Sequence, residues 1–166
     1  PMCGSGTLPL EAALMATDTA PGLLRDYYGF IGWKQYDDVL WQELREEALE
    51  RQHDGLLRKL APIVGYDGDG RAIKAAWQHA KNAGMDKIIH FEKRTLREFS
   101  VSPGSKTGLF VANPPYGERL GEENQLPPLY NQLGEKMAAQ CRGWKAAIIT
   151  SNPQLGRAIG LRAGKI

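Results

Sequence analysis

The stretch "PIVGYDGDGRAIKAAWQHAKNAGMDKIIHFE", residues 62–92, decides the fold. Residues 62–67 form a short apolar run that ends in an acid, which predicts a buried strand. Residues 71–84 have a helical pattern with Gly84 placed to end it, and its apolar face holds Ile73, Ala76, Trp77 and Ala80. Residues 87–92 predict a second strand. Because a helix connects the two strands, we expect them to pair in parallel.

The same alternation of helices and strands continues on both sides of this unit. A helical pattern begins at Thr7, a candidate N-cap, and runs to Ala16. The other predicted elements are helices at 38–60, 126–141 and 153–161, and strands at 108–113 and 145–151. Strands that alternate with helices predict an α/β fold with a Rossmann-like, doubly wound and mainly parallel sheet.

Residues 1–166 are predicted to form one domain with an inserted helical and aromatic segment at about 17–61. Proline, glycine and aromatic residues give the first part of this segment no clear period. We expect Trp33 and Trp41 to pack within it. The sequence opens on "PMCGSGTLPL" and closes on "LRAGKI", so we expect the sheet to be incomplete at both ends.

The composition is ordinary for a soluble globular protein, with 42% hydrophobic and 24% charged residues. The net charge of +2 does not by itself identify a nucleic-acid partner. The two cysteines, Cys3 and Cys141, have no metal-ligand spacing, and the three histidines form no cluster with them. We therefore expect no metal site, no disulfide framework and a reducing, cytoplasmic setting. No apolar run approaches the length needed to span a membrane.

Three informative stretches lie where ligands bind in such sheets, at the carboxyl ends of the strands. The first is "CGSGT", residues 3–7, in which Gly4 and Gly6 allow a ligand to approach the backbone closely. Pro9 stands where a dinucleotide-binding motif requires glycine, and no phosphate-binding P-loop follows. The turn therefore indicates a ligand that has no phosphate groups and lies close to the backbone. A plain tight turn without a ligand is an equal alternative.

The second stretch is the end of the strand at 62–67, where Asp67 stands. An acid at this place can accept hydrogen bonds from two ribose hydroxyls. The alternative is an acid that only ends the strand in a turn. Asp69 lies where a helix N-cap belongs, so we assign it to capping.

The third stretch is "VANPPYGERL", residues 111–120. Pro114 and Pro115 cannot donate to a sheet ladder, so a strand ends here and a stiff loop follows. The plain interpretation is a turn that ends the strand. The alternative is a loop that holds the Asn113 side chain, backbone carbonyls and the Tyr116 ring in fixed positions.

Together these motifs resemble the class I S-adenosylmethionine-dependent methyltransferases that methylate amines. "PMCGSGT" is similar to their first motif, "GYDGD" to their acidic second motif and "NPPYGER" to their catalytic fourth motif. The order of motifs, with "APGL" and "TSNPQLGRAIGLRAGK", most resembles the bacterial 23S ribosomal RNA guanine-N2 methyltransferases of the RlmL (RlmKL) type. The resemblance covers nearly the whole chain, which would be the catalytic domain.

The resemblance implies a role for each motif. The ribose of S-adenosyl-L-methionine would contact Asp67, and other parts of the cofactor would contact Thr95 and Asn113. The cofactor would also contact the first motif, which comprises Pro1, Met2, Cys3, Gly4, Ser5, Gly6 and Thr7. The catalytic residues would be Asn113, Pro114, Pro115 and Tyr116, with the Asn113 side chain and the Pro114 carbonyl accepting from the amine and Tyr116 stacking on the base. Thr95 falls where many relatives carry an acid for the adenine amine.

The implied partner is 23S ribosomal RNA, as a precursor or assembly intermediate. In this family an RNA-binding THUMP domain precedes the catalytic domain, and in some members a second methyltransferase domain follows it. The motifs alone leave other acceptors open, namely adenine N6 in DNA, guanine in transfer RNA and a protein glutamine. A non-catalytic RNA-binding module is the alternative outside the enzymes.

Overall fold

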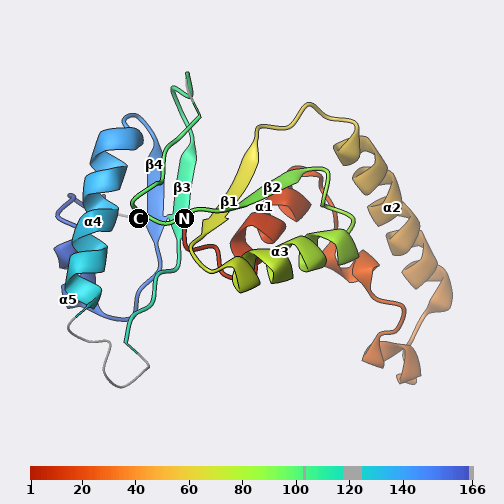
Figure 1. The fold of residues 1–166 in the computed structure, drawn as a ribbon. Helices are drawn as coiled ribbons and strands as arrows, with labels where there is room; N and C mark the ends of the chain where they lie inside the picture. Colours follow the sequence, from red (N-terminus) through yellow and green to blue (C-terminus); the bar gives the residue numbers. More distant parts are fainter. Residues whose placement is uncertain (103, 118–124, 165–166) are drawn as a thin grey trace.

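The structure, a computed structural model, describes residues 1–102, 104–117 and 125–164. Helices alternate with strands along the chain (Figure 1). The α-helices are α1 (Thr7–Ala16), α2 (Asp38–Leu56), α3 (Gly70–Asn82), α4 (Leu126–Gln140) and α5 (Pro153–Ala158), the 3₁₀ helices are η1 (Pro21–Leu24) and η2 (Gly29–Gly32), and the strands are β1 (Ile63–Asp67), β2 (Ile89–Lys93), β3 (Leu109–Ala112) and β4 (Lys145–Ile148).

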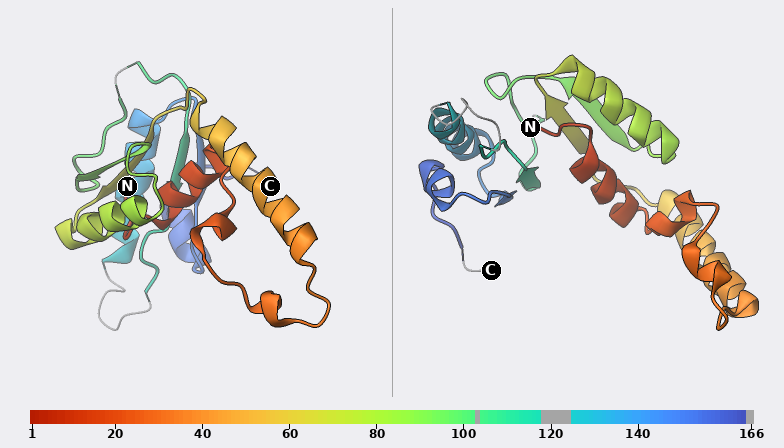
Figure 2. Two further views of the ribbon diagram at one scale, coloured as in Figure 1. Left: turned by 90° about the vertical axis from the view of Figure 1, so that its right-hand side faces the viewer. Right: turned by 90° about the horizontal axis from the view of Figure 1, so that it is seen from below.

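The strands of the described residues pair two and two, and both pairs are parallel. In the first pair Ile63 lies opposite Ile89, and in the second pair Leu109 lies opposite Lys145. The expected α/β class with parallel strands is confirmed. In Figures 1 and 2 the N-terminus lies between the two pairs. A cavity of about 220 Å³ also lies between them, lined by residues of β1 and β3.

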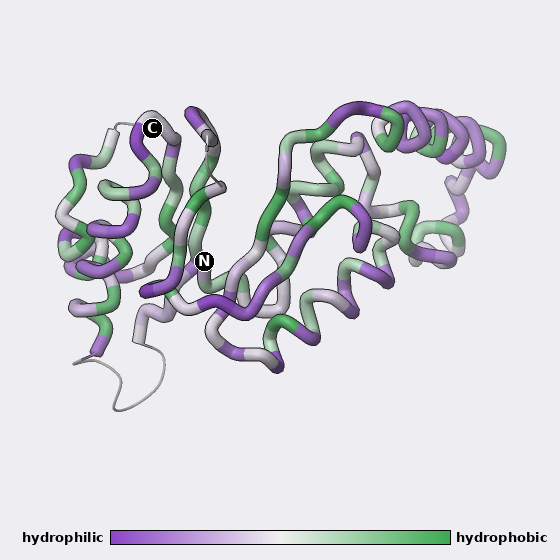
Figure 3. Tube along the Cα trace, turned by 45° about the horizontal axis from the view of Figure 1, so that its top comes forward, coloured by the Kyte–Doolittle hydropathy of each residue, from purple (hydrophilic) through white to green (hydrophobic). Residues whose placement is uncertain are grey.

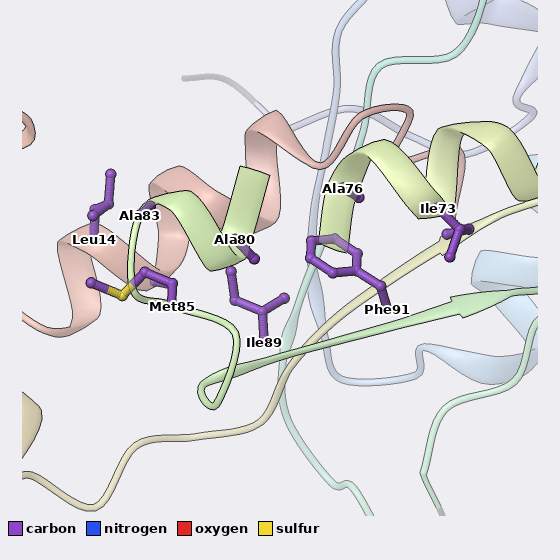
Figure 4. Packing of buried hydrophobic residues seen from close by; sticks show 9 residues of the cluster. Leu14, Ile73, Ala76, Ala80, Ala83, Met85, Ile89 and Phe91 are labelled. Atoms are coloured by element: carbon purple, nitrogen blue, oxygen red, sulfur yellow. The ribbon is translucent and has the colours of Figure 1, made fainter. Parts of the chain in front are cut away.

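The first pair packs against α1 and α3. Its core consists of Ala13, Leu14, Ile73, Ala76, Ala80, Ala83, Met85, Ile89 and Phe91. Figure 4 shows the Phe91 ring of β2 lying against α3 beside Ala76. The apolar face predicted for this helix forms the core, except that Trp77 is 36% exposed. The Trp77 ring makes edge-on contacts with His90 and Phe91. The β1–α3–β2 unit thus has the arrangement that its sequence predicts.

The second pair packs against α4 and α5. Its core joins Leu96, Phe99, Phe110, Ala112, Leu133, Met137 and Cys141, and a smaller cluster joins Leu126, Tyr130 and Leu155. Gly134 allows the two helices to lie close, since a Cβ there would stand 1.8 Å from the backbone oxygen of Ile159. Met2 and Tyr66 pack against the larger of these clusters, so side chains from the first half contact the core of the second.

Residues 17–61 extend away from both strand pairs as an arm (Figure 2). In this arm Trp41 packs edge-on against Tyr28 and Phe30, as we expected, whereas Trp33 is 69% exposed. Helix α2 is largely hydrophilic along its length (Figure 3). Its close approach to α1 depends on Gly55, because a Cβ there would stand 1.8 Å from the backbone oxygen of Thr17.

The helix caps agree with the sequence at α3 and differ at α1. The Asp69 carboxylate accepts from the Arg71 backbone N–H at 2.8 Å, as expected for an N-cap. The prediction that Thr7 caps α1 is wrong, because Gly6 occupies the N-cap position without a side-chain cap. Gly6 has φ 86°, a left-handed conformation that the chain needs in order to leave the turn and enter the helix.

Candidate functional site

The glycine turn at residues 3–7 is held against the end of β1 by backbone hydrogen bonds. The Cys3 N–H donates to the Tyr66 oxygen at 2.9 Å, and the Gly6 N–H donates to the Cys3 oxygen at 3.0 Å. A third contact joins the turn to α3, where a ring nitrogen of His79 lies 3.0 Å from the Ser5 oxygen. The turn therefore has a fixed shape at the carboxyl end of the first strand pair.

Asp67 joins this turn to the end of β1. One carboxylate oxygen accepts from the Gly4 N–H at 2.9 Å, and the other accepts from the Asp69 N–H at 2.9 Å. A carboxylate can accept about four hydrogen bonds, so both oxygens keep capacity for further donors. The predicted ribose-binding acid thus also positions the glycine turn, a role that the sequence did not indicate.

The two glycines of the turn face different surroundings. A Cβ on Gly6 would stand 2.8 Å from the Phe91 ring and 2.9 Å from the Ala76 side chain, so Gly6 packs on the core. A Cβ on Gly4 would meet nothing within 4 Å. A Cβ on Gly68, directly after Asp67, would meet only the Thr95 methyl at 3.8 Å. The backbone at Gly4 and Gly68 is therefore open to a ligand that approaches closely.

Thr95 is held by Glu98, which was not among the predicted site residues. The Thr95 hydroxyl donates to the Glu98 carboxylate at 2.7 Å, and the Thr95 backbone N–H donates to the same oxygen at 2.9 Å. These two hydrogen bonds lower the pKa of Glu98 below its ordinary value, and the one from the hydroxyl makes the larger contribution. The spacing "TLRE" at 95–98 matches a capping-box pattern and could have indicated this contact.

The NPPY loop follows β3 and is held by packing. The Ile149 N–H donates to the Ala112 oxygen at 3.0 Å, which places the exit of β4 beside the start of the loop. Pro114 is fully buried, Pro115 and Asn113 are exposed, and the half-buried Tyr116 packs against the cluster of Leu126, Tyr130 and Leu155. Within the described residues the Asn113 side chain makes no hydrogen bond. Glu118 and Arg119, which end the motif, lie outside the described residues.

The two strand pairs present their loops on the same side. In Figure 1 β1 runs down to the left and β3 runs downward, and the strands of each pair are parallel. The glycine turn follows the N-terminus, and the NPPY loop follows β3 on this lower side. The structure brings Gly4 and Asp67 into direct contact. Asn113 follows β3 of the other pair, and its side chain is exposed.

The cysteines are not activated as nucleophiles. Burial, with a smaller contribution from the Asp67 charge, raises the pKa of Cys3 to about 11. Burial also raises the pKa of Cys141 above its ordinary value. Over residues 1–102, 104–117 and 125–164, no three His, Cys, Asp or Glu side chains gather where they could hold a metal ion. None of the helices in those ranges is both long and apolar enough to cross a membrane.

Comparison with known proteins relates the whole chain to methyltransferases. Residues 1–165 match the family described as RMKL-like, methyltransferase domain. Ribosomal RNA large subunit methyltransferase K/L of Syntrophotalea carbinolica is 49% identical over 168 residues, which cover 100% of this chain and 23% of that protein. The protein of the same name from Methylococcus capsulatus is 48% identical, over 99% of this chain and 22% of its own length. The chain thus spans less than a quarter of these curated relatives.

Solved structures share both the fold and part of the sequence. The structure of SMU.472 complexed with SAH has a TM-score of 0.86 and 32% identity, over 99% of this chain and 42% of that one. A predicted N6-adenine-specific DNA methylase from Listeria monocytogenes has a TM-score of 0.83 and 33% identity over the same shares. The first of these names gives the bound ligand, SAH, and the second gives a predicted substrate, N6-adenine in DNA.

Proposed function

Because the chain belongs to the RMKL-like methyltransferase domain family, we propose that it transfers a methyl group from S-adenosylmethionine to the exocyclic N2 amine of a guanine in 23S ribosomal RNA. The observation that carries this proposal is the NPPY loop, in which a buried proline supports an exposed asparagine beside the carboxyl end of β3. The curated relatives named as ribosomal RNA large subunit methyltransferases support the choice of acceptor.

The exocyclic amine of guanine is a weak nucleophile because its lone pair is delocalised into the ring. The Asn113 side-chain oxygen and the Pro114 carbonyl oxygen accept hydrogen bonds from the two N–H groups of this amine. These hydrogen bonds favour a pyramidal nitrogen with an available lone pair. Positive charge develops on this nitrogen during transfer, and fixed acceptors stabilise it without reorganisation. Tyr116 stacks on the base, which leaves its helix or loop to reach the site.

When bound, S-adenosylmethionine would supply a methyl group on a sulfonium, and its sulfur would keep the electron pair of the broken C–S bond while the amine lone pair forms the new N–C bond. The nitrogen then loses a proton to solvent, and no strong general base is required. Placing the nitrogen in line with the methyl group does much of the remaining work. The residues of the first strand pair fit this cofactor, because the backbone at Gly4 is open and the Asp67 carboxylate keeps acceptor capacity.

The remaining cofactor contacts follow from the same loops. The first motif, residues 1–7, receives the methionine part of the cofactor, and Thr95 lies near its adenine. Because the Thr95 hydroxyl donates to Glu98, its lone pairs point elsewhere and are available to the adenine amine. Asn113 contacts both the cofactor and the acceptor amine.

The chain works as one catalytic domain of a longer bacterial protein in the cytoplasm. Its curated relatives are more than four times as long, which leaves room for an RNA-binding THUMP domain before it and, in some members, a second methyltransferase domain after it. The arm at 17–61 is the insertion of this domain.

Methyl transfer from labelled S-adenosylmethionine tests the proposed reaction. Unmodified 23S rRNA, transfer RNA, DNA and ribosomal protein are offered separately, and the labelled nucleoside is identified after digestion. We expect N2-methylguanosine in 23S rRNA alone. N6-methyladenine in DNA would favour the activity named for the Listeria relative. Binding of RNA without transfer to any acceptor would indicate a non-catalytic module.

A further inference from the structure

A second cavity, separate from the one between β1 and β3, opens beside the NPPY loop. Its volume is about 290 Å³, near the lower end of the range for small-molecule sites, which is about 300–1,000 Å³. Its lining comes from the loop, from the start of α4 and from the segment after β4: Tyr116, Leu126, Pro127, Asn152, Gln154 and Leu155. The cavity combines one aromatic ring, apolar walls and two amide side chains.

Part of the wall of this cavity is formed by the loop that carries Asn113. Tyr116 lines it and also packs against the cluster of Leu126, Tyr130 and Leu155, so the ring is held at the cavity wall. The segment that carries Asn152 leaves β4 directly beside the loop, because the Ile149 N–H donates to the Ala112 oxygen. Asn152 thus lines the cavity, and Asn113 stands three residues before Tyr116 on the adjoining loop.

The Asn152 amide has a defined orientation. Its side-chain oxygen accepts from the Gln154 backbone N–H at 2.9 Å, and its own backbone N–H donates to the Thr150 hydroxyl at 3.2 Å. Because a backbone N–H can only donate, the acceptor must be the amide oxygen, and the NH₂ group points the other way. The side chain is half-buried, and its NH₂ makes no hydrogen bond to the residues that the structure describes.

We infer that this cavity receives the acceptor base and that the Asn152 NH₂ donates to O6 of guanine. The inference rests on the proposed function and adds a residue that selects the base. A guanine held by its N2 amine presents O6 two ring atoms away, as an acceptor. An adenine held by its N6 amine presents an apolar C–H at the equivalent position. A donor fixed at this place therefore pairs with guanine and stays unpaired with adenine.

The Asn152→Asp substitution tests this role with little disturbance of the fold. Aspartate keeps the oxygen that accepts from Gln154, and asparagine and aspartate are equally good N-caps. It replaces the NH₂ donor with an acceptor that repels O6. Asn152→Ser is the neutral companion, since serine also caps a helix but is too short to reach the base. Asn82→Asp is the matched control, because Asn82 lies at the end of α3 and its side chain contacts Gln78.

The readout is the ratio of kcat/KM on two RNAs, measured with the variants in the natural polypeptide. The first is 23S rRNA with guanine at the nucleotide that the wild-type protein methylates, and the second carries 2-aminopurine there. 2-Aminopurine keeps the N2 amine but has no O6. We expect the wild type to prefer guanine by about 10- to 100-fold, the cost of leaving a donor unpaired. Asn152→Asp and Asn152→Ser should bring this ratio close to one, while Asn82→Asp keeps it.

The outcomes separate this inference from the proposed function. If the wild type methylates guanine and both Asn152 variants keep the full preference over 2-aminopurine, the inference is wrong and the proposed function stands. If both substrates lose activity equally in the variants, Asn152 has only a structural role and the inference is again wrong. If the wild type methylates no guanine in 23S rRNA, the proposed function itself fails.

Discussion

In the half built on β1 and β2, the glycine turn is held by hydrogen bonds, whereas in the half built on β3 and β4 the NPPY loop is held by packing. Asp67 accepts from the Gly4 N–H, and Cys3 donates to the end of β1. In the other half Pro114 is fully buried and Tyr116 packs against an apolar cluster. The two halves fix their loops by different forces.

The way in which each loop is held decides which of its groups stay available to a ligand. Hydrogen bonds use the backbone N–H groups of the glycine turn but leave its surface at Gly4 open to a close approach. Packing uses the rings of the NPPY loop and leaves the Asn113 side chain exposed. The first loop suits a ligand that lies on the backbone, and the second suits an amine that needs oxygen acceptors.

The largest effect should come from Gly6→Ala in the first half. The new Cβ would stand within 3 Å of Phe91 and Ala76, and the left-handed φ of 86° disfavours any side chain. Overpacking and backbone strain together should lower the free energy of unfolding by about 3 kcal/mol or more. Urea unfolding followed by circular dichroism measures this.

Gly4→Ala is the matched control for that substitution. Its φ of 56° is also left-handed, but its Cβ meets no atom within 4 Å, so only about 1 kcal/mol should be lost. The same Cβ enters the open surface and should weaken S-adenosylmethionine binding. Equal losses of stability in the two variants would contradict the assignment of Gly6 to the core and Gly4 to the ligand.

A smaller effect is expected for Pro114→Ala in the second half. The substitution leaves a gap at a fully buried ring and frees the unfolded backbone, which should cost about 2 kcal/mol of stability. Pro115→Ala, at an exposed ring, should cost less than about 1 kcal/mol. Thermal unfolding of the two variants compares them, and a larger loss at Pro115 would show that packing does not hold the loop.

Cys3 provides a smaller test of the charge at the glycine turn. Its pKa of about 11 means that little thiolate exists at pH 8, and the fraction grows as the pH rises toward 11. Alkylation by iodoacetamide at pH 8 should therefore be at least about tenfold slower than for a free cysteine.

Asp67→Asn tests the cause of the Cys3 shift. Removing the carboxylate charge should speed alkylation of Cys3, because that charge helps to raise its pKa. Cys141 lies in the other half, where burial alone raises its pKa, so its rate should not change. Equal acceleration of both cysteines would indicate general loosening of the fold instead.

The periodicity of the sequence predicted the elements and their parallel pairing because local patterns determine both. The Asp69 cap was predictable for the same reason, since its partner is two residues away. Thr7 was assigned wrongly as a cap because nothing local shows that Gly6 adopts a left-handed conformation.

Contacts between distant segments could not be read from the sequence. The hydrogen bond between Gly4 and Asp67 joins positions 63 residues apart. The cavity beside Tyr116 likewise depends on packing between the NPPY loop, α4 and α5.

The most direct test of the account is the single-turnover rate of methyl transfer to 23S rRNA by Asn113→Ala, at saturating S-adenosylmethionine. Loss of one fixed acceptor should lower this rate by about 100- to 1,000-fold. Loss of the proposed Asn113 contact to the cofactor should raise the cofactor Kd, measured by calorimetry, by a much smaller factor. Asp67→Asn should behave in the opposite way and mainly weaken cofactor binding. Transfer by Asn113→Ala at the wild-type rate would contradict the account.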